Sequence, residues 1–162
     1  MAEKILLWIE DNPTKNHYEL IQKTARKKGV ELKHVSGAGA LRSVLEDLED
    51  NNEEIVIQGI ILDLMIYGTN NLADFGYPEV SWTDAANVGE YLLKYVFRNI
   101  NPRQKELEKF KLLEKPVLIL TVKSEVRQED FKNYGEKIEL SHKYDLDSAD
   151  LNKQIRDWIN AF

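Results

Sequence analysis

The sequence predicts an α/β protein: a doubly wound, five-stranded parallel sheet with helices on both faces, a three-layer α/β/α sandwich. Two observations predict this fold class. Short apolar runs rich in β-branched residues alternate with longer stretches in which apolar residues recur every three or four positions. Strands and helices that alternate in this way favour parallel strands joined by right-handed crossovers. The 162 residues are enough for one domain with its own hydrophobic core.

The first half of the chain contains three predicted strands and two predicted helices. The run Lys4–Ile9 is apolar from its second residue onward, as expected of a strand buried on both faces. Asn12 followed by Pro13 indicates the N-cap and first position of a helix, which Gly29 ends. The other elements predicted here are a strand at Val30–Val35, a helix at Ala38–Asp50 and a strand at Ile55–Met65.

The second half begins with the least regular part of the chain. Residues Ile66–Ser81 mix glycine, asparagine and aromatic residues without a period, which indicates a long loop. A single domain over residues 1–162 is expected, with an enlarged segment at about 66–115. The elements predicted after the loop are a helix from Thr83 that Pro102 breaks, a charged helix at Arg103–Lys115, a strand at Val117–Val122, a short helix at Ser124–Tyr134, a strand at Lys137–Ser141 and a last helix at Asp147–Phe162.

The composition excludes several classes of protein. The 28 acidic residues outnumber the 22 basic ones, which argues against a nucleic-acid partner because phosphate binding needs clustered cations. The absence of cysteine rules out a disulfide scaffold, a cysteine-ligated metal site and a cysteine nucleophile. The longest apolar stretches are too short to cross a bilayer, and the N-terminus lacks a signal-peptide core. A cytoplasmic protein with no membrane partner is therefore expected.

Charged and hydroxyl side chains follow the predicted strands. Glu10 and Asp11 end the first strand, Asp63 the third, Thr121 the fourth, and Lys143 follows the fifth. Ligands of doubly wound sheets gather beyond the carboxyl ends of the central strands. Three carboxylates brought together there would repel one another unless a cation lies among them or the lysine neutralises them in part. Oxygen ligands without histidine or cysteine suit Mg²⁺, and a carboxylate beside Mg²⁺ can accept a phosphoryl group.

These residues and their surroundings resemble the CheY-like receiver domain of two-component response regulators. The resemblance is carried by the strings LLWIEDNP, IILDLM, VLILT and HKYDLDSADLNKQI, each at the end of an apolar strand. It covers the whole chain apart from the irregular middle. It implies a flavodoxin-like fold with the receiver topology.

The resemblance also implies roles for the residues at the strand ends. Asp63 would accept a phosphoryl group from a phosphohistidine of a sensor histidine kinase or a phosphorelay protein. Lys143 would pair with the phosphoryl oxygens, and the Thr121 hydroxyl would turn toward them. Neutralising the charge of the transferring group is the main catalytic need of such a reaction. Mg²⁺ would be held by the side chains of Glu10, Asp11 and Asp63 and by the backbone carbonyl of Met65.

A stand-alone receiver of this kind is not an enzyme beyond its own phosphorylation and hydrolysis. It would signal through phosphorylation-dependent contacts with a downstream protein. Four positions depart from the family pattern: Tyr67, Val122, Leu140 and Tyr144. Val122, Leu140 and Tyr144 leave open the alternative of a degenerate receiver, a protein-interaction module that works without phosphorylation.

Two other functions use related chemistry. An aspartyl phosphatase of the haloacid dehalogenase kind also has a strand-end Asp and Mg²⁺, but it carries a second acid where this chain has Met65. A flavodoxin-like nucleotide binder is disfavoured because Asn12-Pro13-Thr14 is not a glycine-rich phosphate cradle.

The segment between Asp63 and Thr121 is longer than receivers normally use. It contains the aromatic residues Tyr67, Phe75, Tyr77 and Trp82. Two readings stay open: a compact loop that packs its own aromatic side chains, or a lid or partner-docking surface beside the predicted site.

Overall fold

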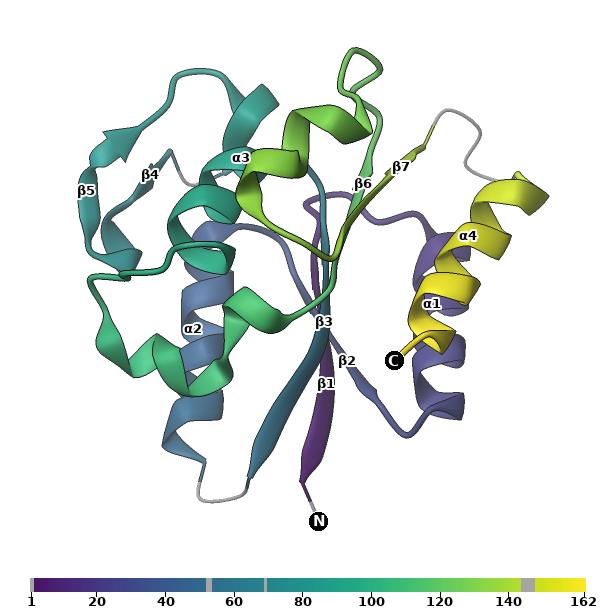
Figure 1. Ribbon diagram of the computed structural model, residues 1–162. Helices are drawn as coiled ribbons and strands as arrows, with labels where there is room; N and C mark the ends of the chain where they lie inside the picture. The colour runs from purple at the N-terminus through teal and green to yellow at the C-terminus, as the bar shows by residue number, and fades with distance from the viewer. Residues whose placement is uncertain (1, 52–53, 69, 144–147) are drawn as a thin grey trace.

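The computed structural model describes residues 2–51, 54–68, 70–143 and 148–162 (Figure 1). Its core is a five-stranded sheet with the order β2-β1-β3-β6-β7, in which neighbouring strands are parallel. This order is that of flavodoxin-like doubly wound sheets, so the predicted fold class is confirmed. The five strands are β1 (Glu3–Ile9), β2 (Glu31–Val35), β3 (Ile55–Leu62), β6 (Val117–Thr121) and β7 (Ile138–His142).

Helices cover both faces of the sheet, and the alternation of side chains along β1 shows why. Ile5, Leu7 and Ile9 belong to the larger hydrophobic cluster, whereas Leu6 and Trp8 belong to the second cluster on the opposite face. Figure 1 shows the resulting three layers. On one face lie α1 (Lys15–Lys27) and α4 (Ala149–Asn160), and on the other lie α2 (Ala38–Asp50) and α3 (Val88–Leu92).

Helix α1 begins two residues later than predicted. Its N-cap is Thr14, whose Oγ1 accepts a hydrogen bond from the backbone N–H of His17 at 3.3 Å. The prediction of Asn12 as the cap was wrong because the backbone N–H of Asn12 donates to Glu10 Oε1 and so belongs to the loop after β1. Gly29, with φ of 69°, follows the end of the helix as predicted. Helix α2 has the predicted bounds.

The irregular segment contains a second, smaller sheet that the sequence does not predict. β3 ends at Leu62, earlier than the predicted Met65. Beyond it, β4 (Asn71–Leu72) and β5 (Tyr77–Ser81) form an antiparallel pair. A two-residue strand has no period to detect, and Pro78 inside β5 argues against a strand.

The helix predicted from Thr83 to Pro102 is shorter and irregular. A 3₁₀ turn at Ala85–Asn87 leads into α3, and a π-helical turn at Leu93–Phe97 follows it. The backbone N–H of Gly89 donates to the carbonyl of Leu64 at 3.0 Å, so the start of α3 rests on the loop that follows β3.

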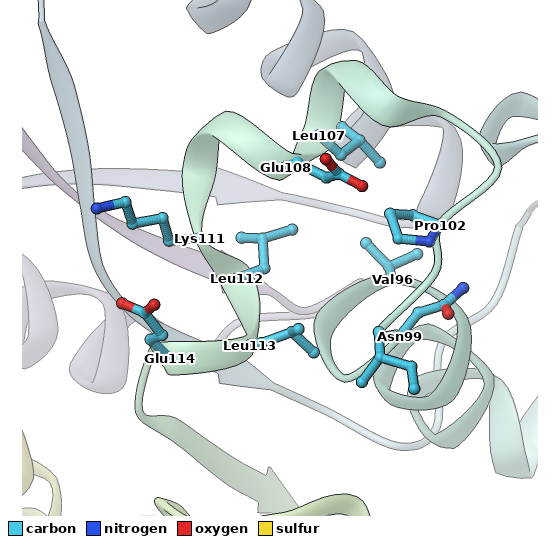
Figure 2. A pocket seen from close by; sticks show the side chains of 10 residues that line it. Val96, Asn99, Pro102, Leu107, Glu108, Lys111, Leu112, Leu113 and Glu114 are labelled. Carbon is cyan, nitrogen blue, oxygen red and sulfur yellow. The ribbon is translucent and has the colours of Figure 1, made fainter.

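The single charged helix predicted at Arg103–Lys115 was wrong. The segment forms two 3₁₀ helices, Lys105–Phe110 and Leu112–Glu114, which meet at Lys111 in the left-handed conformation (φ 51°). Figure 2 shows this bend around a hollow of about 230 Å³ with a largely apolar lining. None of the predicted site residues lines it.

The guanidinium of Arg98 holds the end of the inserted segment in place. Its Nη1 donates to the carbonyls of Phe97 and Leu112 at 3.0 Å, and its Nη2 donates to those of Lys115 and Glu136 at 2.7 and 3.2 Å. The bonds to Leu112 and Lys115 tie the chain that follows the bend to the end of the π-helical turn, an arrangement that no local sequence pattern encodes.

The last elements agree closely with the prediction. The short helix is a 3₁₀ helix at Gln128–Tyr134, β6 ends at Thr121, and β7 is shifted by one residue. α4 begins after the N-cap Ser148, and Asp147 lies outside the described residues. Among the described helices, none combines the length and the apolar character that a membrane span requires.

Candidate functional site

The predicted site residues lie at the carboxyl edge of the sheet because parallel strands end at the same edge. Glu10 and Asp11 follow β1, Asp63 follows β3, and Lys143 follows β7. Glu10 and Asp63 are each 3% exposed and Lys143 is 9% exposed. Charged side chains this deeply buried need partners, and here they find them in one another.

The centre of the site is a buried ion triad. Lys143 Nζ lies 2.5 Å from Glu10 Oε2 and 3.2 Å from Asp63 Oδ2. The backbone N–H of Lys143 donates to the carbonyl of Thr121 at 2.7 Å, which holds the lysine beside the end of β6. The ammonium therefore stands between carboxylates delivered by the first and third strands.

Backbone amides orient the carboxylates. The N–H of Met65 donates to Asp63 Oδ1 at 3.2 Å, and the N–H of Tyr67 donates to Asp11 Oδ2 at 3.1 Å. Sequence reasoning missed the contribution of Tyr67, because a backbone donor leaves no signal in residue type. The loop after β3 thus fixes carboxylates from two different strands.

Glu10, Asp11 and Asp63 each offer an oxygen within 4.8 Å of the others, a spacing that one cation can bridge. The donor set contains only oxygen, which fits Mg²⁺ rather than a soft transition metal. Three carboxylates against one ammonium leave negative charge for a divalent cation to neutralise. Met65, whose carbonyl was predicted as a further ligand, lines one hollow of the surface together with Glu10, Asp11 and Asp63.

The electrostatics of the site follow from its burial. Burial of Glu10 and the nearby charge of Asp63 raise its pKa to about 7, against the opposing pull of Lys143. Burial alone would lower the pKa of Lys143, but the charges of Glu10 and Asp63 outweigh it and raise that pKa. The lysine is thus the fixed positive charge of the site.

Thr121 lies beside the four charged residues of the site. It is the last residue of β6, fully buried, and its hydroxyl accepts a hydrogen bond from the backbone N–H of Lys123 at 3.2 Å. It does not line the hollow over the acidic side chains. The structure thus brings Glu10, Asp11, Asp63 and Lys143 together and leaves Thr121 beside them.

A hollow of about 370 Å³ opens over the site. Two apolar side chains at its rim are unusually exposed, Tyr67 at 66% and Val122 at 48%. Both were singled out from the sequence as departures from the receiver pattern, and both line the hollow. Tyr144, a third departure, lies outside the described residues.

Comparison with known proteins returns solved structures only. No protein-family model and no curated protein matches the sequence. A signal receiver domain from Vibrio parahaemolyticus is 15% identical, with 99% of this chain and 92% of that one covered and a TM-score of 0.48. A CheY-like response regulator receiver domain from Methanospirillum hungatei is 14% identical, with 99% and 96% covered and a TM-score of 0.47.

A third similar structure is the receiver domain of a sensor histidine kinase from Pseudomonas aeruginosa, which has a magnesium ion coordinated in its active-site cleft. It is 16% identical, with 99% of each chain covered and a TM-score of 0.43. The three structures named here are receiver domains. The function of this chain is inferred below from its own residues.

Proposed function

We propose that this chain is a receiver module that accepts a phosphoryl group on Asp63 from the phosphohistidine of a sensor histidine kinase or a phosphorelay protein. One observation carries the proposal. A buried Asp63 lies with its carboxylate 3.2 Å from a lysine ammonium, and two further carboxylates, Glu10 and Asp11, are close enough to share one cation with it.

The transfer exchanges one bond to phosphorus for another. An oxygen of the Asp63 carboxylate forms the new P–O bond while the P–N bond of the donor breaks. The electron pair of that bond stays on the imidazole nitrogen, which is then protonated from solvent. The acceptor needs no separate base because the carboxylate of Asp63 is itself the nucleophile.

The side chains around Asp63 supply what phosphoryl transfer needs most, which is positioning and charge neutralisation. Lys143 presents a preorganised ammonium to the oxygens of the arriving group, and its own burial strengthens that interaction. The amide of Met65 restricts the orientation of the Asp63 carboxylate. Mg²⁺, held by Glu10, Asp11 and Asp63, would neutralise phosphoryl oxygens when bound.

Signalling would then follow from the change of charge at one edge of the sheet. A phosphoryl group on Asp63 adds negative charge beside Lys143 and competes with Glu10 for its ammonium. The module would act through phosphorylation-dependent protein contacts rather than through turnover of a substrate.

The test is incubation with acetyl phosphate and Mg²⁺ followed by intact-mass measurement. The wild-type protein is expected to gain one phosphoryl group, and Asp63→Asn, which keeps the size of the side chain, is expected to gain none. Omitting Mg²⁺ should slow the gain. An unchanged mass of the wild-type protein would count against the proposal.

The exposed rim favours one alternative, an interaction module that works without phosphorylation. Tyr67 and Val122 place apolar surface at the mouth of the site, and exposed apolar surface is typical of protein contacts. A partner that binds wild-type protein and Asp63→Asn equally well, with and without acetyl phosphate, would support that alternative.

A further inference from the structure

The inserted segment carries an apolar surface that the function proposed above does not use. The exposed large apolar side chains in the described part of the chain are Tyr67, Ile100, Leu113 and Val122. Tyr67 and Val122 line the hollow over the acidic side chains. Ile100, which is 86% exposed, and Leu113 line the hollow of the inserted segment instead. Exposed apolar side chains beside an apolar hollow are typical of a protein contact.

This hollow has the size and lining to hold an apolar side chain. Val96, Leu107 and Leu112 are its buried lining, and Pro102 adds a further apolar wall (Figure 2). The hollow measures about 230 Å³, and a cavity of about 150 Å³ is enough to hold benzene. The side chain of an isoleucine, which has fewer carbon atoms than benzene, therefore fits inside it.

Bonds to the rest of the protein hold this surface in a fixed shape. Arg42 Nη2 of α2 lies 3.2 Å from Glu106 Oε1, and Lys109 Nζ donates to a backbone carbonyl of α2 at 2.7 Å. Arg98 holds the end of the segment through two further carbonyls. A surface whose shape is set before binding loses little conformational freedom on association.

Charged side chains of both signs surround the hollow. Glu108, Lys111 and Glu114 line it, and all three are exposed. Figure 2 shows Lys111 and Glu114 on one side of the hollow and the carboxylate of Glu108 on another. When two copies of such a surface meet about a two-fold axis, acidic groups of one copy can pair with the lysine of the other. A partner with charges of a single sign would match this rim less well.

We propose that the inserted segment forms a two-fold symmetric dimer interface, in which Ile100 of each copy enters the hollow of the other. The occupant is a second copy because one face carries an exposed apolar side chain, a hollow that can receive it and rim charges of both signs. The net charge of -6 opposes association at long range, but physiological salt screens it beyond about 8 Å. The proposal goes beyond the function proposed above and does not depend on it.

The interface lies on the side of the sheet that α2 and α3 cover. The buried lining of the hollow belongs to the larger hydrophobic cluster, which contains side chains of both helices. The helices α1 and α4 cover the opposite face (Figure 1). The proposal therefore assigns a contact to the part of the chain that exceeds the usual length of a receiver.

The experiment measures the oligomeric state of the whole protein by sedimentation equilibrium between about 5 and about 500 µM. Ile100→Asp places a charge where the proposal requires an apolar side chain. Since Ile100 is exposed, the variant should keep its fold, which far-UV circular dichroism checks. Val122→Asp is the matched control because it changes an exposed β-branched side chain outside the interface.

The wild-type protein and Val122→Asp are expected to dimerise with a dissociation constant below about 100 µM. Ile100→Asp should dimerise at least about a hundredfold more weakly, because one substitution removes two buried side chains from the symmetric contact. A monomeric wild type would overturn the proposal and leave the hollow to a different occupant. So would a dimer that Ile100→Asp leaves unchanged or that Val122→Asp dissociates, since the contact would then lie on another face.

A second experiment tests the charges of the rim. Lys111→Glu leaves only acidic groups among the charged residues that line the hollow, and the double variant Glu108→Lys, Glu114→Lys leaves only basic ones. Each protein alone should dimerise at least about fivefold more weakly than the wild type because like charges then meet. An equimolar mixture should form a mixed dimer at least as tight as the wild-type dimer. A mixture that associates no more tightly than either variant alone would overturn the two-fold arrangement.

Discussion

Replacing Gly89 with alanine tests how α3 is seated against the candidate site. A Cβ on Gly89 would lie 2.0 Å from the carbonyl oxygen of Asp63 and 2.7 Å from the Cα of Leu64. Both atoms belong to the backbone, so no side chain can turn away to make room. The start of α3 and the loop after β3 must separate if the variant folds.

The magnitude of the effect follows from the size of this overlap. Ordinary contact begins at 3.4 Å, so the carbonyl of Asp63 is too close by 1.4 Å. Overpacking of this kind costs about 1–3 kcal/mol, and loss of the bond from Gly89 N–H to the Leu64 carbonyl adds about 0.5–1.5 kcal/mol. The better helix propensity of alanine returns at most about 1 kcal/mol. We expect Gly89→Ala to lower the free energy of unfolding by about 0.5–3.5 kcal/mol.

The assay is urea unfolding followed by far-UV circular dichroism, with a second glycine as control. A Cβ on Gly37 would meet its nearest neighbour, the carbonyl of Tyr67, at an ordinary 3.7 Å. Gly37→Ala should therefore cost much less than Gly89→Ala. A Gly89→Ala protein as stable as the wild type would refute the close seating of α3 on the backbone of Asp63.

Three further predictions concern other buried or bridging groups. Lys143→Met leaves two buried carboxylates without their cation and should lower the free energy of unfolding by about 3–5 kcal/mol in urea without Mg²⁺; a loss below about 1 kcal/mol would contradict the buried triad. Arg98→Met removes four hydrogen bonds, three of them to carbonyls distant in the sequence, and should lower the free energy of unfolding by about 2–4 kcal/mol in the same assay; a loss below about 0.5 kcal/mol would contradict the bridging role of Arg98. Burial, and then the hydrogen bond to Glu90, raise the pKa of Tyr134 from 10.0 to about 12, so the folded protein binds its proton more tightly than the unfolded chain. The stability of the wild-type protein should therefore fall as the pH rises from 10 to 12, and the stability of Tyr134→Phe should fall less. The measurement is thermal unfolding at a series of pH values, and equal falls for both proteins would refute the assignment.

The sheet and the acidic centre of the site could be predicted because both are encoded locally. Each buried strand is a continuous apolar run, and the residue that ends it is read directly from the sequence. Since parallel strands end at one edge, Glu10, Asp63 and Lys143 had to lie near one another once the strand order was that of a doubly wound sheet.

The inserted segment could not be predicted because long-range contacts decide its conformation. The charged run 103–115 has helical propensity, but Lys111 adopts a left-handed conformation and Arg98 binds the carbonyls of Leu112 and Lys115 that follow it. The hydrogen bond from the backbone amide of Tyr67 to Asp11 could not be predicted either, because a main-chain donor does not depend on residue type. The two hydrogen bonds of the Gln128 side chain also cannot be predicted from the sequence. Their partners are the backbone groups of Ile138 and Leu140, ten and twelve residues away.

The proposed acceptor role of Asp63 is tested most directly by a crystal structure with Mg²⁺ and beryllofluoride, which imitates a phosphoryl group on a carboxylate. The account predicts density for beryllofluoride bonded to Asp63, a cation among the carboxylates of Glu10, Asp11 and Asp63, and the ammonium of Lys143 turned to the fluorine atoms. A structure with the Asp63 carboxylate unmodified and Lys143 still paired with Glu10, under conditions that modify a known receiver domain, would contradict it.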